Sequence, residues 1–338
     1  MASSFPTRAL GRTGFEITRV GFGAWAIGGG GWVAGWGPQD DDESIAAIRH
    51  AVESGVNWVD TAAIYGLGHS EEVVGAALAV FPDADRPYVF TKCGVLPDPE
   101  DVMRPNQWIG DPASIRSEIE GSLKRLGVER IDLYQMHWPP RDGTPIEAYW
   151  STLMDLKAAG KVAAIGVSNH TVEMLEEAEA IGHVDTMQPP FSLINRAAGA
   201  EIIPWCAAHD TGVIVYSPMQ SGLLTGTFSA ERIASLPADD WRSRNAQFQS
   251  PKLEANLALA DALTPIADRH HTSVGAVAIA WTLSFTGVTG AIVGARRPEQ
   301  IDGWIAAATL ELDAEDLAAI VTAIETTGAG DGPSGPSA

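Results

Sequence analysis

Four polar side chains with proton-transfer chemistry follow short apolar runs of this sequence. Asp60 ends the run VNWVD, Lys92 ends YVFTK, His137 ends IDLYQMH, and Tyr65 lies in the segment directly after Asp60. A tyrosine hydroxyl has a pKa of about 10 and is a poor proton donor near neutral pH. An adjacent lysine ammonium is expected to lower that pKa, and a carboxylate beside the lysine would keep the lysine charged. The four residues therefore predict an acid–base site.

The chemistry that fits this set is hydride transfer to a carbonyl. The tyrosine would protonate the oxygen as the carbonyl carbon accepts a hydride, or deprotonate an alcohol in the reverse direction. His137 would hydrogen-bond the same oxygen and orient it. The set contains no nucleophile, and the adjacent His270 and His271 cannot present both rings on one helix face as metal ligands. Hydrolysis is therefore disfavoured, and we expect no metal site.

The elements that must position these residues are short β-branched, apolar runs that alternate with longer segments of helical period. Eight such runs predict a parallel (β/α)8 TIM barrel with long βα loops, in which active groups follow the C-terminal ends of the strands. No compositional break divides the chain, so we expect one α/β domain over residues 1–325, with an open doubly wound sheet as the alternative. The expected strands are 17–23, 56–61, 88–93, 131–137, 162–168, 184–188, 212–217 and 290–295.

The intervening segments include one helix with clear end signals. The stretch DPASIRSEIEGSLKRLG has Asp111 as N-cap, Pro112 in the first turn and Gly127 as the stop. Residues 219–250 have weak periodicity and are long for a βα loop, which is typical of a functional segment. The tail 326–338 is rich in Gly, Pro and Ser, and we expect it to be disordered.

The glycine-rich stretch RVGFGAWAIGGGGWVAGWG, residues 19–37, contains the G-x-G-x-x-A spacing of a dinucleotide-binding turn. That turn must open a helix immediately, but the first helical period begins only near Ser44. We therefore interpret GFGAW as the first barrel strand entering the mouth. The glycine run would let a loop pass close to the ligand.

Composition narrows the class of partner and the compartment. The chain has 22 Lys and Arg against 43 Asp and Glu, a net charge of −21 that disfavours nucleic acid. Two cysteines, Cys93 and Cys206, are typical of a reducing cytoplasm. The N-terminal segment has no apolar signal core, so we expect no export.

One charge-free stretch, residues 272–295, is long enough to raise the question of a membrane span. Gly287 and Gly290 interrupt it, and Thr and Ser are scattered through it. A buried helix over about 274–284 followed by a strand over 289–295 explains it better, so we expect no membrane association.

Several motifs that follow the predicted strands resemble those of the aldo-keto reductases. They are WVDTAAIYGLGHSEEVVGAAL (58–78), TKCG (91–94), IDLYQMHWP (131–139) and IGVSNH (165–170), and the resemblance extends from about residue 7 to about 325. The chain is most similar to the bacterial branch whose layout is shared with potassium-channel β-subunits. The resemblance implies that Asp60, Tyr65, Lys92 and His137 form the catalytic tetrad, with Tyr65 as general acid or base.

The resemblance also implies a set of cofactor-binding positions. An Arg at position 296 suits a 2′-phosphate, so NADP(H) is expected in preference to NAD(H). The family commonly has an Asn four residues beyond Gln300 that contacts adenine, but this chain has Trp304, which leaves adenine recognition open. The implied cofactor residues are Ala24, Trp25, Asp60, Ser168, Asn169, Gln188, Tyr216, Ser217, Pro218, Gln220, Gly222, Leu223, Gly294, Arg296 and Gln300.

The substrate is expected at the mouth formed by the loops after the first, second and fourth strands. The residues expected to contact it are Trp25, Trp32, Tyr65, His137 and Trp138. Several tryptophans suit a flat, partly apolar aldehyde but also the faces of a sugar ring. The leading hypothesis is an NADP-dependent reductase of aldehydes or ketones. The alternatives are a sugar or polyol dehydrogenase and a cofactor-binding regulatory subunit, and monomer and homo-oligomer both stay open.

Overall fold

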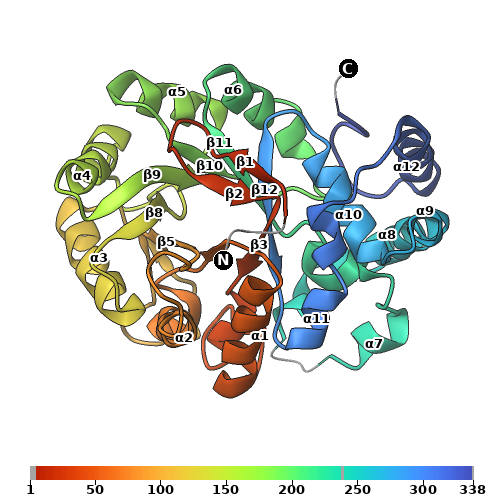
Figure 1. Ribbon diagram of the computed structural model, residues 1–338, viewed down its shortest axis with the longest axis horizontal. Helices are drawn as coiled ribbons and strands as arrows, with labels where there is room; N and C mark the ends of the chain where they lie inside the picture. Colours follow the sequence, from red (N-terminus) through yellow and green to blue (C-terminus); the bar gives the residue numbers. More distant parts are fainter. Residues whose placement is uncertain (1–4, 237–239, 337–338) are drawn as a thin grey trace.

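The computed structural model describes residues 5–236 and 240–336, and its parallel strands close into a barrel (Figure 1). Around the barrel, β3 pairs with β4 on one side and with β12 on the other, through the register Ala291↔Val20. This closure confirms the predicted (β/α)8 barrel and rules out the open sheet. The barrel strands are β3 (Val20–Gly23), β4 (Trp58–Asp60), β5 (Tyr88–Cys93), β8 (Ile131–Met136), β9 (Val162–Ser168), β10 (Thr186–Gln188), β11 (Gly212–Tyr216) and β12 (Val288–Gly294).

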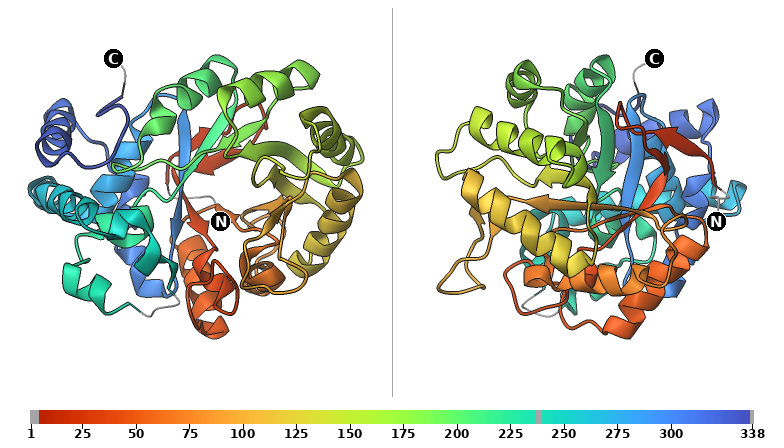
Figure 2. Two further views of the ribbon diagram at one scale, coloured as in Figure 1. Left: turned by 180° about the vertical axis from the view of Figure 1, so that it is seen from behind. Right: turned by 60° about the vertical axis from the view of Figure 1, so that its left-hand side comes forward.

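Helices surround the strands in the views of Figures 1 and 2. The predicted end signals of α3 are confirmed, because the Asp111 carboxylate accepts from the Ser114 N–H and Gly127 ends the helix with a left-handed backbone, φ 68°. The helices are α1 (Asp41–Glu53), α2 (His69–Leu78), α3 (Pro112–Leu126), α4 (Ile146–Ala158), α5 (Val172–Ile181), α6 (Ile202–Ala208), α7 (Ala230–Ala234), α8 (Lys252–Ala262), α9 (Thr264–Arg269), α10 (Val274–Leu283), α11 (Pro298–Asp302) and α12 (Ala314–Thr327).

The barrel interior is built in layers by the period of two along each strand. Trp58, Phe90 and Leu133 belong to one buried cluster near the strand starts. Two residues further along the same strands come Asp60, Lys92 and Gln135, which are also buried. The apolar layer therefore supports a polar layer directly above it, at the C-terminal side of the barrel.

The expected first strand, 17–23, is divided in the structure. Residues Glu16–Thr18 form β2, which pairs with β1 (Thr7–Ala9) in an antiparallel hairpin, and only Val20–Gly23 enters the barrel. Leu10 and Ile17 pack into the lower cluster of the barrel interior, so the hairpin closes that end. The hairpin therefore covers the apolar interior at the end where the barrel strands begin.

The charge-free stretch forms α10 and β12, as predicted. Nine of the ten residues of α10 are buried, all but Val274, which explains the absence of charge on every face. Among the described residues, no helix combines the length and hydropathy that crossing a membrane requires.

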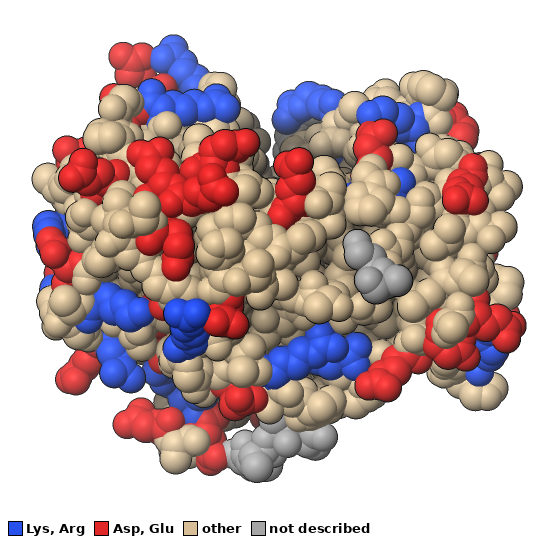
Figure 3. Space-filling model, turned by 90° about the horizontal axis from the view of Figure 1, so that it is seen from above, with Lys and Arg blue, Asp and Glu red and all other residues tan. Residues whose placement is uncertain are grey.

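On the face shown in Figure 3, basic side chains occur in separate groups among acidic and uncharged ones.

The long segment 219–250 folds into short pieces rather than a regular loop, although its residues 237–239 lie outside the described part. It contains α7 and the 3-10 turns η4 (Gln220–Thr225), η5 (Trp241–Arg244) and η6 (Ala246–Phe248). Two further short strands, β6 (Val95–Leu96) and β7 (Gln107–Trp108), form a ribbon after β5. Both segments extend the C-terminal side of the barrel.

The predicted disorder of residues 326–338 is not what the structure shows. Helix α12 continues to Thr327, and the described part of the tail, up to residue 336, docks on the loop after β10. The buried Arg196 guanidinium donates to the carbonyls of Ala329, Gly330 and Gly332. The composition of the tail predicted disorder because composition does not reveal that a distant side chain, Arg196, donates hydrogen bonds to these carbonyls. Residues 337–338 lie outside the described residues.

Candidate active site

A large cavity of about 1730 Å³ opens where the barrel strands end. It is larger than the roughly 300–1,000 Å³ that holds a typical small ligand. Most of the predicted site residues line it: Ala24, Trp25, Trp32, Asp60, Tyr65, His137, Trp138, Ser168, Asn169, Gln188, Tyr216, Ser217, Pro218, Gly222, Gly294, Arg296 and Gln300. The barrel therefore brings together residues that lie up to 276 positions apart in the sequence, from Ala24 to Gln300.

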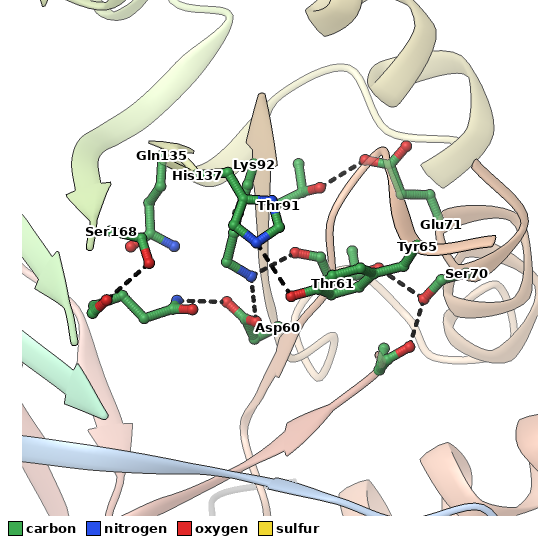
Figure 4. Close-up of polar contacts among 12 residues, drawn as sticks. Asp60, Thr61, Tyr65, Ser70, Glu71, Thr91, Lys92, Gln135, His137 and Ser168 are labelled. Carbon is green, nitrogen blue, oxygen red and sulfur yellow. Dashed lines mark hydrogen bonds and ion pairs between the residues drawn. The ribbon is translucent and has the colours of Figure 1, made fainter. Parts of the chain in front are cut away.

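The four acid–base residues form two contacting pairs at the floor of this cavity (Figure 4). The Lys92 ammonium donates to Asp60 Oδ1 at 2.5 Å and to the Thr61 carbonyl at 2.8 Å. The Tyr65 hydroxyl lies 3.5 Å from His137 Nε2. Lys92 Nζ is 5.3 Å from the centre of the Tyr65 ring, and it lies beneath the cavity rather than in its lining. A substrate oxygen between Tyr65 and His137 would reach both.

A second layer of buried contacts holds these pairs. Gln188 Nε2 donates to the second carboxylate oxygen of Asp60 at 2.9 Å. The Ser70 hydroxyl joins the Thr61 hydroxyl at 2.8 Å and donates to the Ala24 carbonyl at 2.8 Å. Sequence reasoning missed Ser70, although it stands inside the motif GLGHSEE that carried the resemblance.

The pKa shifts of these residues differ from the expectation for Tyr65. Burial raises the pKa of the Tyr65 hydroxyl well above its ordinary value, and the Asp60 and Tyr216 side chains add to the rise. The expected lowering by Lys92 is wrong for this arrangement, because the ammonium donates to Asp60 and Thr61 instead of the phenol. Burial also lowers the pKa of His137 well below its ordinary value, with Lys92 contributing. At neutral pH the site therefore presents a protonated phenol beside a neutral imidazole.

The glycine run fixes the position of the Tyr65 loop by direct backbone contact. A Cβ atom on Gly28 would lie 2.9 Å from both the Gly66 nitrogen and the Tyr65 carbonyl carbon. A Cβ atom on Gly66, whose φ is 60°, would lie 2.2 Å from the Gly28 oxygen. The two glycines are needed because their backbones touch with no room for a side chain.

Replacing Gly28 by alanine is expected to displace the catalytic tyrosine. The clash is with backbone atoms that cannot rotate away, so the loop must shift, and small misplacements of reacting groups cost about a hundredfold in rate. We expect kcat to fall about tenfold or more, measured against Gly335→Ala as control. A Cβ at Gly335 meets only a Val321 methyl at 3.4 Å. Unchanged kcat in Gly28→Ala would contradict the positioning role.

The residues after β9 and β11 are joined by hydrogen bonds beside His137. The Tyr216 hydroxyl donates to Asn169 Oδ1 at 2.8 Å, and Asn169 Nδ2 donates to the His137 carbonyl at 3.0 Å. The Ser168 hydroxyl donates to the Gln188 carbonyl at 2.8 Å. Asn169 has a left-handed backbone, φ 63°, which asparagine tolerates better than most residues. The predicted carboxamide-binding group is therefore one connected unit.

At the other end of the cavity, the Arg296 side chain forms hydrogen bonds with the loop after β3. Its guanidinium donates to the Trp36 and Pro38 carbonyls and to Gln39 Oε1. The backbone N–H of Arg296 donates to Gln300 Oε1 at 2.6 Å. Three further arginines that the sequence did not single out for this role also line the cavity: Arg232, Arg242 and Arg297.

An aromatic cluster connects the loop after β3 with the long segment after β11. The Trp241 ring stacks on Trp25 at 5.6 Å, and Trp25 stacks on Tyr65 at 6.2 Å. The Arg242 guanidinium lies 4.8 Å from the Trp36 ring. Trp241 was missed because nothing in its own neighbourhood of the sequence signals a contact with residue 25.

Two predicted cofactor residues do not line the cavity. Leu223 is fully buried in the core, and Gln220 Oε1 accepts from the Ser192 hydroxyl at 3.0 Å. Met219 and Ser221 line the cavity in their place. Trp304 is both buried and part of the lining, and its Nε1 has no hydrogen-bond partner within the described part of the chain.

Comparison with known proteins decides the family. The family model described as "Aldo/keto reductase family" matches residues 19–325. The chain belongs to the aldo/keto reductase family. This aldo/keto reductase is 35% identical over 293 residues to the aldo-keto reductase YhdN of Bacillus subtilis, which covers 86% of each chain. It is 33% identical to the NADH-specific methylglyoxal reductase of Escherichia coli, over 80% of this chain and 84% of that one.

The solved structures include a glycerol dehydrogenase from Gluconobacter oxydans with a TM-score of 0.86, 37% identity and full coverage of both chains. Aldo/keto reductases use nicotinamide cofactors, and the cavity of this aldo/keto reductase fits such a group. The cavity has room for a dinucleotide and a substrate, and it extends from the protonated phenol of Tyr65 to a group of arginines suited to phosphate.

Proposed function

We propose that this enzyme reduces aldehydes or ketones with NADP(H), with Tyr65 as the general acid. The observation that carries the proposal is the 3.5 Å separation between the Tyr65 hydroxyl and His137 Nε2 at the floor of the cavity. One carbonyl oxygen can lie within hydrogen-bond distance of both atoms. The raised pKa of Tyr65 keeps the phenol protonated, as a proton donor must be.

The roles of the four residues follow from their contacts. Bound nicotinamide supplies the hydride that the carbonyl carbon accepts. The lowered pKa keeps His137 neutral, and the tautomer with its proton on Nε2 would hydrogen-bond the carbonyl oxygen and orient it toward Tyr65. Tyr65 gives its proton to that oxygen as negative charge develops on it. The Lys92 ammonium, held by Asp60, lies 5.3 Å from the centre of the Tyr65 ring and forms part of the buried layer against which the ring packs.

The cofactor contacts in the proposal follow the cavity lining. Ser168, Asn169 and Gln188 would hold the carboxamide, and the Tyr216 ring would stack on the nicotinamide. The phosphates would lie along Ser217, Pro218, Met219, Ser221 and Gly222, with Arg296 and Arg297 near the adenosine phosphate. Four of the arginines in the lining, Arg232, Arg242, Arg296 and Arg297, favour NADP(H), whereas the Escherichia coli relative is by name NADH-specific.

Replacing Arg296 by alanine is expected to weaken NADPH binding about tenfold more than NADH binding, because a charge-assisted pair with the 2′-phosphate is lost. The change also frees the loop at residues 36–39, which should affect both cofactors equally. Gln39→Ala is the matched control, since it removes one loop contact of Arg296 without removing a charge. Fluorescence titration measures both affinities, and equal losses in Arg296→Ala would contradict the phosphate role.

A second candidate is a polyol dehydrogenase that works mainly in the oxidative direction. The likeness to a glycerol dehydrogenase over the full chain favours it. Oxidation needs Tyr65 as phenolate, and the raised pKa of Tyr65 would move that activity to alkaline pH.

The two buried, unpaired cysteines, Cys93 and Cys206, suit a reducing compartment, and we propose the cytoplasm.

The test is a panel run in both directions with both cofactors. Purified enzyme is assayed for NADPH and NADH oxidation with aldehydes, and for NADP⁺ and NAD⁺ reduction with glycerol and free sugars. We expect the highest kcat/KM for an aldehyde with NADPH near neutral pH. Higher values for glycerol or a sugar would favour the dehydrogenase, and tight NADPH binding without any turnover would favour a regulatory subunit.

A further inference from the structure

Two indole rings and a guanidinium form a stack on the cavity wall beside His137. The Trp108 and Trp138 rings are 4.7 Å apart and nearly parallel, with an interplanar angle of 16°. The Arg141 guanidinium carbon lies 3.6 Å from the centre of the Trp108 ring. All three side chains line the cavity. Because a stacked guanidinium keeps its N–H groups in its own plane, this one can still bind an anion at its edge.

The backbone holds this stack in place. The Arg141 N–H donates to the Trp108 carbonyl at 2.8 Å, which joins the loop after β8 to β7. The Gly110 N–H donates to Asp142 Oδ2 at 2.9 Å, and the Ile109 N–H donates to the Gly94 carbonyl at 2.9 Å. Both loops are therefore fixed to each other and to the end of β5, so the guanidinium has a defined position.

The charge of Arg141 is not neutralised within the described residues. No carboxylate of that part of the chain lies within ion-pair distance of its guanidinium, which is exposed to the cavity. The nearby Asp142 carboxylate instead accepts from the N–H groups of Gly110 and Thr144, which lower its pKa. Arg141 therefore presents its positive charge to the cavity. Its place in the cavity wall indicates that a ligand supplies the partner.

Arg141 is also separate from the arginines assigned to the cofactor. It follows β8, whereas Arg296 and Arg297 follow β12, and these two strands stand four places apart in the closed order of the barrel. They therefore lie on opposite sides of the mouth. Trp138 is the neighbour of His137 in the chain, and Trp108 and Trp138 pack against the same small cluster as Tyr65. The stack is thus on the substrate side.

We propose that the substrate is a carbonyl compound that also carries an anionic group, a carboxylate or a phosphate. Its apolar or planar part would pack beside Trp138, its anion would bind the edge of Arg141, and its carbonyl would reach Tyr65 and His137. This specificity rests on the proposed reductase function. It adds a discriminating contact that a neutral aldehyde cannot make.

The test compares an anionic substrate with a neutral one of the same shape. The NADPH-loaded enzyme is assayed with 4-carboxybenzaldehyde and its methyl ester, and with glyceraldehyde 3-phosphate and glyceraldehyde. In Arg141→Met, which keeps an apolar stem on Trp108, we expect the kcat/KM ratio of anionic to neutral substrate to fall at least about tenfold. Arg116→Met is the charge-matched control, because Arg116 is exposed on α3 and pairs with Asp155. A fall in this ratio for the benzaldehyde pair would indicate a carboxylate, and a fall for the glyceraldehyde pair would indicate a phosphate.

Each outcome bears on one proposal. If the aldehydes are reduced and the ratio is the same in Arg141→Met and Arg116→Met, the anion site is wrong and the reductase function stands. If no aldehyde is reduced, the reductase function is wrong, and calorimetric titration of the NADPH-loaded enzyme with terephthalate decides the anion site. Weaker terephthalate binding in Arg141→Met than in Arg116→Met would support it, and equal binding would overturn it.

Discussion

Replacing Tyr65 by phenylalanine is expected to lower kcat for aldehyde reduction by about a thousandfold, because general acid catalysis contributes about 10²–10⁴ in rate. The ring would keep its contacts with Trp25 and His137, so only the proton donor is lost. NADPH affinity should change little. Steady-state kinetics with the best aldehyde of the panel and a fluorescence titration of NADPH measure the two effects.

The control for this substitution is Tyr149→Phe. Tyr149 is also a buried tyrosine whose hydroxyl contacts a histidine, at 2.8 Å from His170 Nε2, but it does not line the cavity. Its loss of a hydroxyl should leave kcat nearly unchanged. Retention of more than about a tenth of the activity in Tyr65→Phe would sink the assignment of the general acid.

Replacing Lys92 by methionine is expected to destabilise the fold strongly. Lys92 and Asp60 are 1% and 2% exposed, so their ion pair is almost completely buried. Removing one member of a buried pair leaves an uncompensated charge and costs about 3–5 kcal/mol. We expect the free energy of unfolding in urea to fall by about that amount at pH 7, and turnover to fall with it.

A double variant separates the charge from the packing. Lys92→Met with Asp60→Asn leaves no buried charge, so it should recover part of the lost stability but not the activity. Its unfolding free energy should therefore lie above that of Lys92→Met alone. If the single variant unfolds at the same urea concentration as the native protein, the pair is not a structural element of the barrel.

The barrel and the four acid–base residues were predictable because both depend on local patterns. Each barrel strand is a short apolar run. Because the parallel strands of a barrel all end at one mouth, the polar residues that follow these runs must lie close together. Asp60, Lys92 and His137 each stand at such an end. The division of the first strand was missed, because only Arg19 separates β2 from β3 and the two together resemble one strand in the sequence.

The features that sequence reasoning missed depend on contacts between distant segments. Arg296 donates to the loop at residues 36–39, 257 positions away from Gln39, and Trp241 stacks on Trp25. The direction of the Tyr65 pKa was wrong for a similar reason. Residue types gave the partners of Lys92 but not their geometry, and burial of the phenol outweighs a cation that donates elsewhere.

The docked tail has a consequence for how this chain folds during synthesis. Arg196 is made long before its acceptors, because the Ala329 carbonyl follows 133 residues later. Until residues 329–332 have been synthesised, this guanidinium cannot donate to their carbonyls. The loop after β10 therefore gains these hydrogen bonds only late in synthesis, and a chain that stops at residue 325 would lack them.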